Sequence, residues 1–270
     1  MPNSANVILT RPLAQSRLLA EKLTALGYNV VLFPLLEIAP LAQDSDAYRQ
    51  LQVTLHDLPR YALAAFVSPN AVHAVFQGGL KWPSGVAIAV MGEGSRSALA
   101  EYGINDTNAR IFSPTDPFRS DSETLLETLD LTALRGKAAV IFRSESGREL
   151  LADALANEGV KVDKVIAYQR LIPTLSSAYV HRLNELLTCS GTWVVSSSEA
   201  LRTLESMVMN QTVKRDGHHD DTDAVVKMHQ IDLWVSHQRI AQNAANSGFK
   251  QVQLIGSGDE NLLLALQSRP

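Results

Sequence analysis

Short apolar runs alternate with helix-like stretches along the whole chain. Eight runs have the length and the apolar, partly β-branched content of buried strands: NVILT, NVVLF, LAAFV, VAIAV, AAVIF, VDKVIAY, TWVVS and DLWVS. After most of these runs, apolar residues recur at helical spacing, as at Leu18, Leu19, Leu23, Leu150, Leu151 and Leu155. This alternation predicts an α/β protein with parallel sheets that helices cover on both faces.

Three segments of the first half of the chain recur in the second half. LTRPLAQSRLLAEKLTALGYNV (residues 9–30) aligns without gaps to IFRSESGRELLADALANEGVKV, with Arg11 on Arg143 and Gly27 on Gly159. FVSPNAV matches VSSSEAL, and IAVMGEGSRSALAEYG matches DLWVSHQRIAQNAANSG with an uncertainty of one residue. The chain therefore contains two related copies of one structural unit.

The order of the repeated segments predicts two domains of similar size, each with a flavodoxin- or Rossmann-like parallel sheet. The inner domain is predicted at 38–170, and the outer domain combines 1–37 with 171–270. The chain then crosses between the domains within 33–41 and 166–173, where prolines and extended apolar residues suit a two-stranded linker. Two domains on two linkers predict a cleft between them, the usual place for a ligand.

The stretch at 207–230 fits neither copy and is interpreted as an insertion in the outer domain. Five residues in it invite a metal site: His218, His219, Asp220, Asp221 and Asp223. Their spacing is not that of a regular ligand set, and a solvated loop is the preferred interpretation. We therefore predict no metal.

Composition restricts the partners and the compartment. The chain has 270 residues and a net charge of -4, which gives no overall attraction to nucleic acid or anionic membranes. No run approaches the roughly 18 apolar residues of a membrane span, and the N-terminus does not resemble a secretory signal. The single Cys189 cannot form an intrachain disulfide and is predicted to be a small buried residue. A soluble, cytoplasmic protein is expected.

Nucleotide-binding glycine loops and the serine-hydrolase elbow are absent from the sequence. Hydroxyl, amide or basic residues recur instead where strands end and helices begin: Thr10, Arg11, Ser68, Asn70, Ser95, Arg143, Ser144, Arg148, Ser197, Ser198, Ser236 and His237. One interpretation is that the small polar residues are N-caps, each stabilising its helix by about 1 kcal/mol. The other is an anion receptor, because strand carboxyl ends face the ligand in parallel sheets and helix N-termini carry positive charge. In an anion receptor, Arg11, Arg143 and Arg148 add full positive charges; otherwise they are simply exposed to solvent.

In their order and spacing, LTRPLAQSRLLAEKLTALGYNVVLFPLLEIAPL, FVSPNAV, FRSESGRELLADALANEGVKVDKVIAYQR and VVSSSEAL are similar to the uroporphyrinogen-III synthase family of tetrapyrrole biosynthesis. The resemblance covers almost the whole chain except 207–230. It implies two α/β domains joined by a two-stranded ladder, and a lyase that dehydrates and closes hydroxymethylbilane to uroporphyrinogen III with inversion of ring D. It also implies a polycarboxylate substrate and no metal or organic cofactor.

The resemblance assigns roles to individual residues. It makes Tyr168 of VIAYQR the proton donor to the departing hydroxyl, or else a binding group at the cleft wall. Ser68 and Ser197 match hydroxyl corners of the family, and Ser95 stands where threonine is usual. His237 begins a segment that departs from the family pattern and is interpreted as a helix cap rather than a carboxylate ligand. The predicted substrate-binding residues are Arg11, Ser68, Asn70, Ser95, Arg143, Arg148, Ser197, Ser198, Ser236 and His237.

A non-catalytic two-lobed binding or sensor protein for a small polyanion is the alternative hypothesis, and a family member without activity is a third. We further expect a monomer that receives its substrate by handover from the preceding pathway enzyme and binds neither nucleic acid nor membrane.

Overall fold

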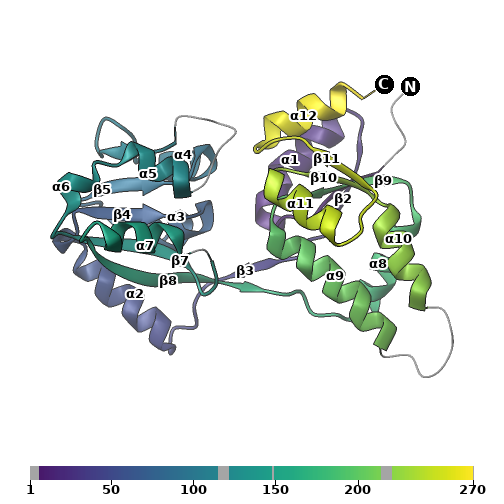
Figure 1. Cartoon of the computed structure of the whole chain (residues 1–270), viewed down its shortest axis with the longest axis horizontal. Helices are drawn as coiled ribbons and strands as arrows, with labels where there is room; N and C mark the ends of the chain where they lie inside the picture. The colour runs from purple at the N-terminus through teal and green to yellow at the C-terminus, as the bar shows by residue number, and fades with distance from the viewer. Residues whose placement is uncertain (1–5, 115–121, 148, 214–220, 270) are drawn as a thin grey trace. The chain divides into compact units, whose positions relative to one another are not determined.

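The chain forms two compact units. The computed structural model describes residues 6–114, 122–147, 149–213 and 221–269 (Figure 1). Unit 1 consists of Met1–Glu37 and Leu171–Pro270, and unit 2 of Ile38–Arg170. The chain thus passes into unit 2 after Glu37 and returns to unit 1 after Arg170.

Unit 1 is a five-stranded parallel sheet with helices on both faces. Its strands are β1 (Asn6–Leu9), β2 (Asn29–Leu32), β9 (Gly191–Val195), β10 (Asp232–Val235) and β11 (Gln251–Leu254). Its helices are α1 (Leu13–Ala25), α8 (Ser177–Thr188), α9 (Ser198–Val213), α10 (Asp221–Gln230), α11 (Gln238–Asn246) and α12 (Asp259–Gln267). The strand order β11-β10-β9-β1-β2 is the flavodoxin-like order.

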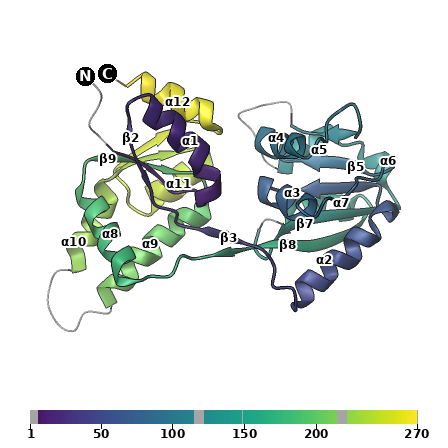
Figure 2. The same ribbon diagram turned by 180° about the vertical axis from the view of Figure 1, so that it is seen from behind.

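Unit 2 contains the second sheet. Its strands are β3 (Glu37–Ala39), β4 (Leu63–Phe66), β5 (Ala87–Val90), β6 (Ile111–Phe112), β7 (Ala138–Ser144) and β8 (Lys161–Leu171). Its α-helices are α2 (Asp46–His56), α3 (Pro69–Phe76), α4 (Glu93–Glu101), α5 (Ser122–Thr128), α6 (Leu131–Leu134) and α7 (Leu150–Asn157), and Leu58–Arg60 forms a short 3₁₀ helix. The order is β3-β8-β7-β4-β5-β6, and Figure 2 shows β3 beside β8 at one edge. Without β3, the five parallel strands have the classic Rossmann order 3-2-1-4-5, without a sixth strand.

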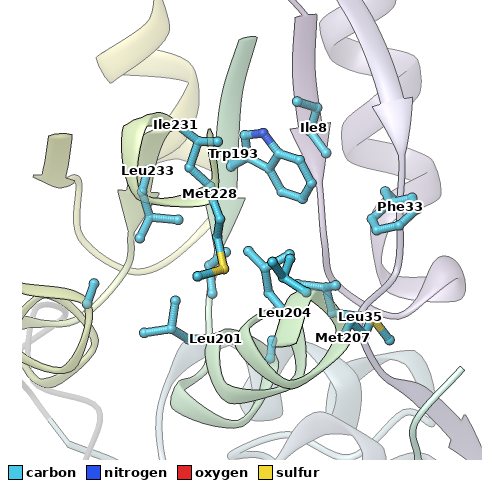
Figure 3. Packing of buried hydrophobic residues seen from close by; sticks show 14 of the residues in the cluster. Ile8, Phe33, Leu35, Trp193, Leu201, Leu204, Met207, Met228, Ile231 and Leu233 are labelled. Carbon is cyan, nitrogen blue, oxygen red and sulfur yellow. The ribbon is translucent and has the colours of Figure 1, made fainter. Parts of the chain in front are cut away.

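The inner strands of each sheet are buried on both faces, which is why β1, β4, β5, β9 and β10 are largely apolar. Alternate residues of β1 enter different clusters: Ile8 packs with Trp193 beneath α8, α9 and α11 (Figure 3), while Val7 packs on the other face with α1 and α12. Val140 and Ala139 of β7 divide in the same way between the two clusters of unit 2. Helices therefore pack on both faces of both sheets, and the polar residues are left to the strand ends.

Strand pairing repeats between the units. β1 pairs with β2 so that Asn6 lies opposite Asn29, and β7 pairs with β8 so that Ala138 lies opposite Lys161. The sequence repeat aligns Asn6 with Ala138 and Asn29 with Lys161, so the same register occurs twice. In space, β2-β1-β9-β10-β11 corresponds to β8-β7-β4-β5-β6. The two units are thus the same sheet assembled from chain segments in a different order.

The sheet registers also determine the alignment that the sequence left uncertain by one residue. Val90 lies opposite Phe66 in unit 2, and Val235 lies opposite Val195 in unit 1. Because Phe66 and Val195 are equivalent in the repeat, Val90 is equivalent to Val235. The start of α4 therefore corresponds to the start of α11.

The predicted α/β class with two parallel sheets is confirmed, and all eight predicted strands are present. The sequence pattern did not indicate β6 and β11, which are short or carry exposed positions. β3 lies within 33–41, the first predicted linker segment, and is the neighbour of β8. Two of the leucines at helical spacing do not belong to the core: Leu18 is 72% exposed and Leu150 is 37% exposed. Both lie one position before a buried leucine, on the outer side of their helices.

Two local predictions in unit 1 are wrong. Cys189 is exposed, because it caps the end of α8 outside the face that buries Leu183 and Leu187. The preferred solvated loop at His218–Asp223 is wrong in its second part, since α10 begins at Asp221 and buries Met228 in the core. His218, His219 and Asp220 lie outside the described residues.

Candidate functional site

The carboxyl ends of β4 and β8 bring two hydroxyl groups together in unit 2. Ser68 follows β4, and its Oγ lies 2.9 Å from the phenol oxygen of Tyr168 in β8. The two strands flank β7 in the sheet, so this contact passes across the end of β7. Ser68 Oγ also accepts a hydrogen bond of 3.2 Å from the backbone N–H of Ala71, as the N-cap of α3. The Tyr168 ring is buried, with 2% of its surface exposed.

An irregularity in the sheet places the tyrosine at this end. Arg143 of β7 lies opposite Ile166, but the next residue, Ser144, lies opposite Tyr168, so β8 has one extra residue at this point. Ala167 and Tyr168 consequently pack into the same apolar cluster, although successive residues of a regular strand face opposite sides of the sheet. Such bulges redirect side chains beside functional sites, and here the bulge brings a phenol to the end of the sheet.

Arg143 is held within unit 2 by a carboxylate. Its Nη1 donates to Glu149 Oε1 at 2.7 Å, and its Nε donates to the Ser144 carbonyl at 3.3 Å. Lys164 Nζ donates to the other oxygen of Glu149 at 3.0 Å. The hydrogen bond from Lys164, and after it the one from Arg143, lowers the pKa of Glu149 below its ordinary value. Because only 8% of Arg143 is exposed, its guanidinium group is held in place by these hydrogen bonds and is not solvated.

Ser95 occupies the neighbouring corner of unit 2. It lies in the first turn of α4, where its backbone N–H bonds to the Gly92 carbonyl at 3.1 Å, and it is buried. Asn70 lies in the first turn of α3, directly after Pro69. Polar residues thus lie at the carboxyl ends of four consecutive strands: Tyr168 in β8, Ser144 at the end of β7, Ser68 after β4 and Ser95 after β5.

In unit 1, several serine hydroxyls lie along the equivalent edge of the sheet. Ser197 Oγ accepts a bond of 3.0 Å from the Ala200 N–H, which repeats the cap that Ser68 makes. Ser198 Oγ accepts from Asn243 of α11 at 3.2 Å. Ser236 Oγ contacts the Ser196 carbonyl at 3.4 Å, which ties the end of β10 to the end of β9.

His237 does not cap α11 with its side chain, contrary to the prediction. It stands at the N-cap position, but its ring lies 3.1 Å from Ser257 Oγ, measured to Nε2. The reason is that Ser257, after β11, stands beside it and also reaches the Ser236 carbonyl at 3.4 Å. The ring therefore points along the edge of the sheet, toward the next strand end.

Arg11 pairs with a carboxylate of its own unit, as Arg143 does. Its Nη1 lies 2.5 Å from Asp259 Oδ1 at the start of α12. Gly258 precedes Asp259 with a φ of 95°, a conformation that favours glycine, and this turn directs the aspartate toward β1. Both repeat-equivalent arginines thus hold an internal carboxylate at a strand end.

The structure brings some predicted residues together and separates others. Side-chain capping explains Ser68 and Ser197 but not Thr10, whose hydroxyl donates to the Val194 carbonyl at 2.7 Å. Arg148 lies outside the described residues. The sequence pattern did not indicate the residues that contact these side chains and that of Tyr168: Glu149, Lys164, Ser257, Asp259 and Arg170. The GSGD run at 256–259 was the available signal, since it is another strand-to-helix corner.

Other features do not add chemistry to these edges. A shallow hollow is lined by Arg17, Ala20, Glu21, Thr24, Ala25 and Leu32, none of them predicted site residues. Among the described residues, no group of three or more His, Cys, Asp or Glu side chains is arranged to hold a metal ion. No helix in the described ranges has both the length and the apolar character that crossing a membrane requires.

Two doubly wound units with hydroxyl and arginine side chains at their strand ends define a two-domain α/β protein. The chain belongs to the uroporphyrinogen-III synthase family, because the family model described as "Uroporphyrinogen-III synthase HemD" matches residues 18–253. The resemblance found in the sequence is thereby confirmed. Membership makes the chain an enzyme of the lyase class and supports the catalytic hypothesis over the non-catalytic binding protein.

Individual relatives agree with this assignment. The uroporphyrinogen-III synthase of Salmonella typhimurium is 29% identical over 267 residues, which cover 97% of this chain and 100% of the relative. The Escherichia coli enzyme is 27% identical over 263 residues, with the same shares covered. A crystal structure of a mutant Thermus thermophilus uroporphyrinogen III synthase superposes with a TM-score of 0.57 at 16% identity, covering 98% of this chain and 100% of that one. The Helicobacter pylori enzyme gives 0.56 at 11% identity over the same shares, and these two likenesses show the fold alone.

Proposed function

We propose that the chain closes hydroxymethylbilane to uroporphyrinogen III, with loss of water and inversion of ring D, and that Tyr168 donates the proton to the departing hydroxyl. The observation that carries this proposal is the buried Tyr168 phenol, hydrogen-bonded to Ser68 at the carboxyl end of the sheet in unit 2. Ligands of parallel α/β sheets bind outside the carboxyl ends of the strands, so this hydroxyl pair has a suitable position for chemistry.

The substrate is a polycarboxylate, and the strand ends supply groups that recognise such an anion. Backbone N–H groups of helix N-termini, hydroxyls and arginines all donate hydrogen bonds to carboxylates. We propose that the predicted binding residues of both units take part: Arg11, Ser68, Asn70, Ser95, Arg143, Arg148, Ser197, Ser198, Ser236 and His237. Arg11 and Arg143 do so from fixed positions, because Asp259 and Glu149 orient their guanidinium groups.

Positioning carries most of the proposed catalysis. Loss of the hydroxyl gives a reactive azafulvene, which closes to the wrong isomer unless the chain of pyrroles is folded so that the substituted carbon attacks through a spiro intermediate. Holding reacting atoms in the correct geometry supplies several kcal/mol without a dedicated nucleophile. The enzyme therefore needs many binding groups and one proton donor.

An isomer assay tests the proposed reaction. Purified protein receives hydroxymethylbilane without added metal, and the oxidised products are resolved into type I and type III isomers. We expect type III to predominate, whereas the no-enzyme control gives type I. Type I alone would exclude the synthase reaction and return the chain to the binding-protein alternative.

A Tyr168→Phe variant tests the assigned role of the phenol. General acid catalysis contributes about 10²- to 10⁴-fold, so kcat is expected to fall by about a hundredfold or more. Unchanged turnover would remove Tyr168 from the chemical step.

We further propose that the enzyme is a cytoplasmic monomer that receives its substrate by handover from the preceding pathway enzyme. The exposed thiol of Cys189 is compatible with a reducing compartment. Light scattering after size-exclusion chromatography tests the monomer, with a mass near 29.4 kDa as the expected result.

A further inference from the structure

Arg170 contacts the same phenol oxygen that Ser68 contacts. It stands two residues after Tyr168 in β8, so both side chains leave the strand on the same face. Arg170 Nη2 donates to the phenol oxygen at 3.3 Å, and its guanidinium carbon lies 5.9 Å from the centre of the Tyr168 ring. The phenol oxygen therefore lies between a cation and the Ser68 hydroxyl.

The direction of the hydrogen bonds around this oxygen follows from counting donors. Arginine only donates, so the Tyr168 oxygen accepts from Arg170. Ser68 Oγ accepts from the backbone N–H of Ala71. Two hydroxyl protons remain, and only one of them can lie between Ser68 and Tyr168. The other proton therefore points away from the pair.

We infer that Arg170 is a positioning residue that makes Tyr168 the outward donor of this pair. When Ser68 donates to the phenol oxygen, that oxygen accepts from Ser68 and Arg170 together and directs its own proton outward. This inference rests on the proposed proton transfer from Tyr168 to the departing hydroxyl.

Arg170 also faces the charge that the proposed step creates. The carbon–oxygen bond of the substrate breaks, its electron pair leaves with the oxygen, and the Tyr168 proton completes a water molecule. The phenol oxygen is then negative, with the Arg170 guanidinium and the Ser68 hydroxyl directed at it. The proton that the substrate releases when ring closure is complete returns to Tyr168, so the cycle balances.

An Arg170→Met variant separates this role from direct substrate binding. A hydrogen bond to a charged group contributes enough that kcat is expected to fall by about ten- to a hundredfold, with KM nearly unchanged. Arg170→Lys keeps the charge and is expected to recover part of the loss. Arg49→Met is the control, because Arg49 lies on α2 and pairs with Asp46 at the surface. Circular dichroism and the urea midpoint verify that each variant is folded.

The deciding measurement is a double-mutant cycle with Tyr168→Phe. If Arg170 acts through the phenol, Arg170→Met lowers kcat in the native background but has little further effect once the hydroxyl is absent. Equal fold-losses in both backgrounds, or a raised KM with unchanged kcat, would overturn the inference. The cycle with Arg170→Lys gives the same decision if the methionine variant does not fold. A failure of the proposed function is distinguishable, since the native protein would then form no type III isomer, or Tyr168→Phe alone would retain full turnover.

Discussion

Ser68 and Ser197 show how one side-chain contact separates two equivalent positions. Both serines come two residues after a strand, and both accept a hydrogen bond from the N–H three residues later. Ser68 additionally contacts the phenol of Tyr168. The counterpart of Tyr168 in the repeat is Leu36, so the sequence of unit 1 offers no phenol at that position. At the residue scale, the serine–phenol pair therefore occurs in unit 2 and not at the equivalent position of unit 1.

Ser68→Ala is expected to affect both stability and turnover. Loss of the cap costs about 1 kcal/mol of unfolding free energy, and loss of the bond to Tyr168 lowers kcat roughly five- to tenfold. Urea unfolding and steady-state kinetics measure the two effects. Ser45→Ala is the matched control, because Ser45 caps α2 through the Tyr48 N–H at 3.1 Å. It should lose similar stability but keep its kcat; equal kcat for the two variants would contradict the prediction.

Glu149 gives a prediction for acid unfolding. Its pKa lies below the ordinary 4.5, because Lys164 and Arg143 bind its ionised form. A carboxyl with a lowered pKa stabilises the native state fully above its unfolded value, and this contribution disappears as pH falls through the native value. Glu149→Gln should therefore be less stable than the native protein at neutral pH, and the gap should shrink below pH 4.5. Urea midpoints of both proteins from pH 7 to pH 3 test this; a gap independent of pH would count against it.

At the scale of elements, the sequence reveals strands that are buried and conceals those that are not. The eight predicted strands belong to strongly apolar segments, so the apolar pattern found them. β11 reads QVQL and exposes Leu254 to 47%, and β6 has only two residues, so neither resembles a buried strand. The contacts of the site were harder to foresee. The bulge that brings Tyr168 beside Ser144 depends on the pairing of β7 with β8, which periodicity within one strand does not encode.

Helix α10 is expected to be a structural part of unit 1. It packs against α8 and α9, and Met228 within it is 2% exposed, whereas Val226 is 46% exposed. Met228→Ala should cost about 2–4 kcal/mol of unfolding free energy, since truncating a buried methionine leaves a cavity. Val226→Ala on the same helix should cost less than about 0.5 kcal/mol. Similar urea midpoints for the two variants would show that α10 does not contribute to the core.

At the scale of the whole molecule, the two units differ in how they occupy the chain. Unit 2 is continuous from Ile38 to Arg170 and has apolar clusters on both faces of its sheet. Unit 1 is assembled from two segments, and β1 from the first pairs with β9 from the second. Its architecture is therefore complete only when both segments are present.

A fragment spanning 38–170 is expected to fold by itself. Its sheet is buried on both faces by its own helices, which is the condition for an independent domain. Urea unfolding followed by circular dichroism should show one cooperative transition. The fragment should lack synthase activity, because the proposed binding residues of unit 1 are missing. A gradual loss of signal without a transition would contradict independent folding.

The pairing of β1 with β9 also sets an order of events on the ribosome. Asn6 lies opposite Gly191, so the first strand has no partner on one side until the ribosome has added most of the chain. Unit 2 is synthesised in the interval and can complete its sheet first. Because β3 and β8 are neighbours in that sheet, its folding brings the two segments of unit 1 close together. Folding of unit 2 therefore provides most of the loop-closure entropy that pairing β1 with β9 would otherwise require. Until then, the N-terminal segment has an unpaired strand edge and is the part of the nascent chain most prone to wrong strand pairing.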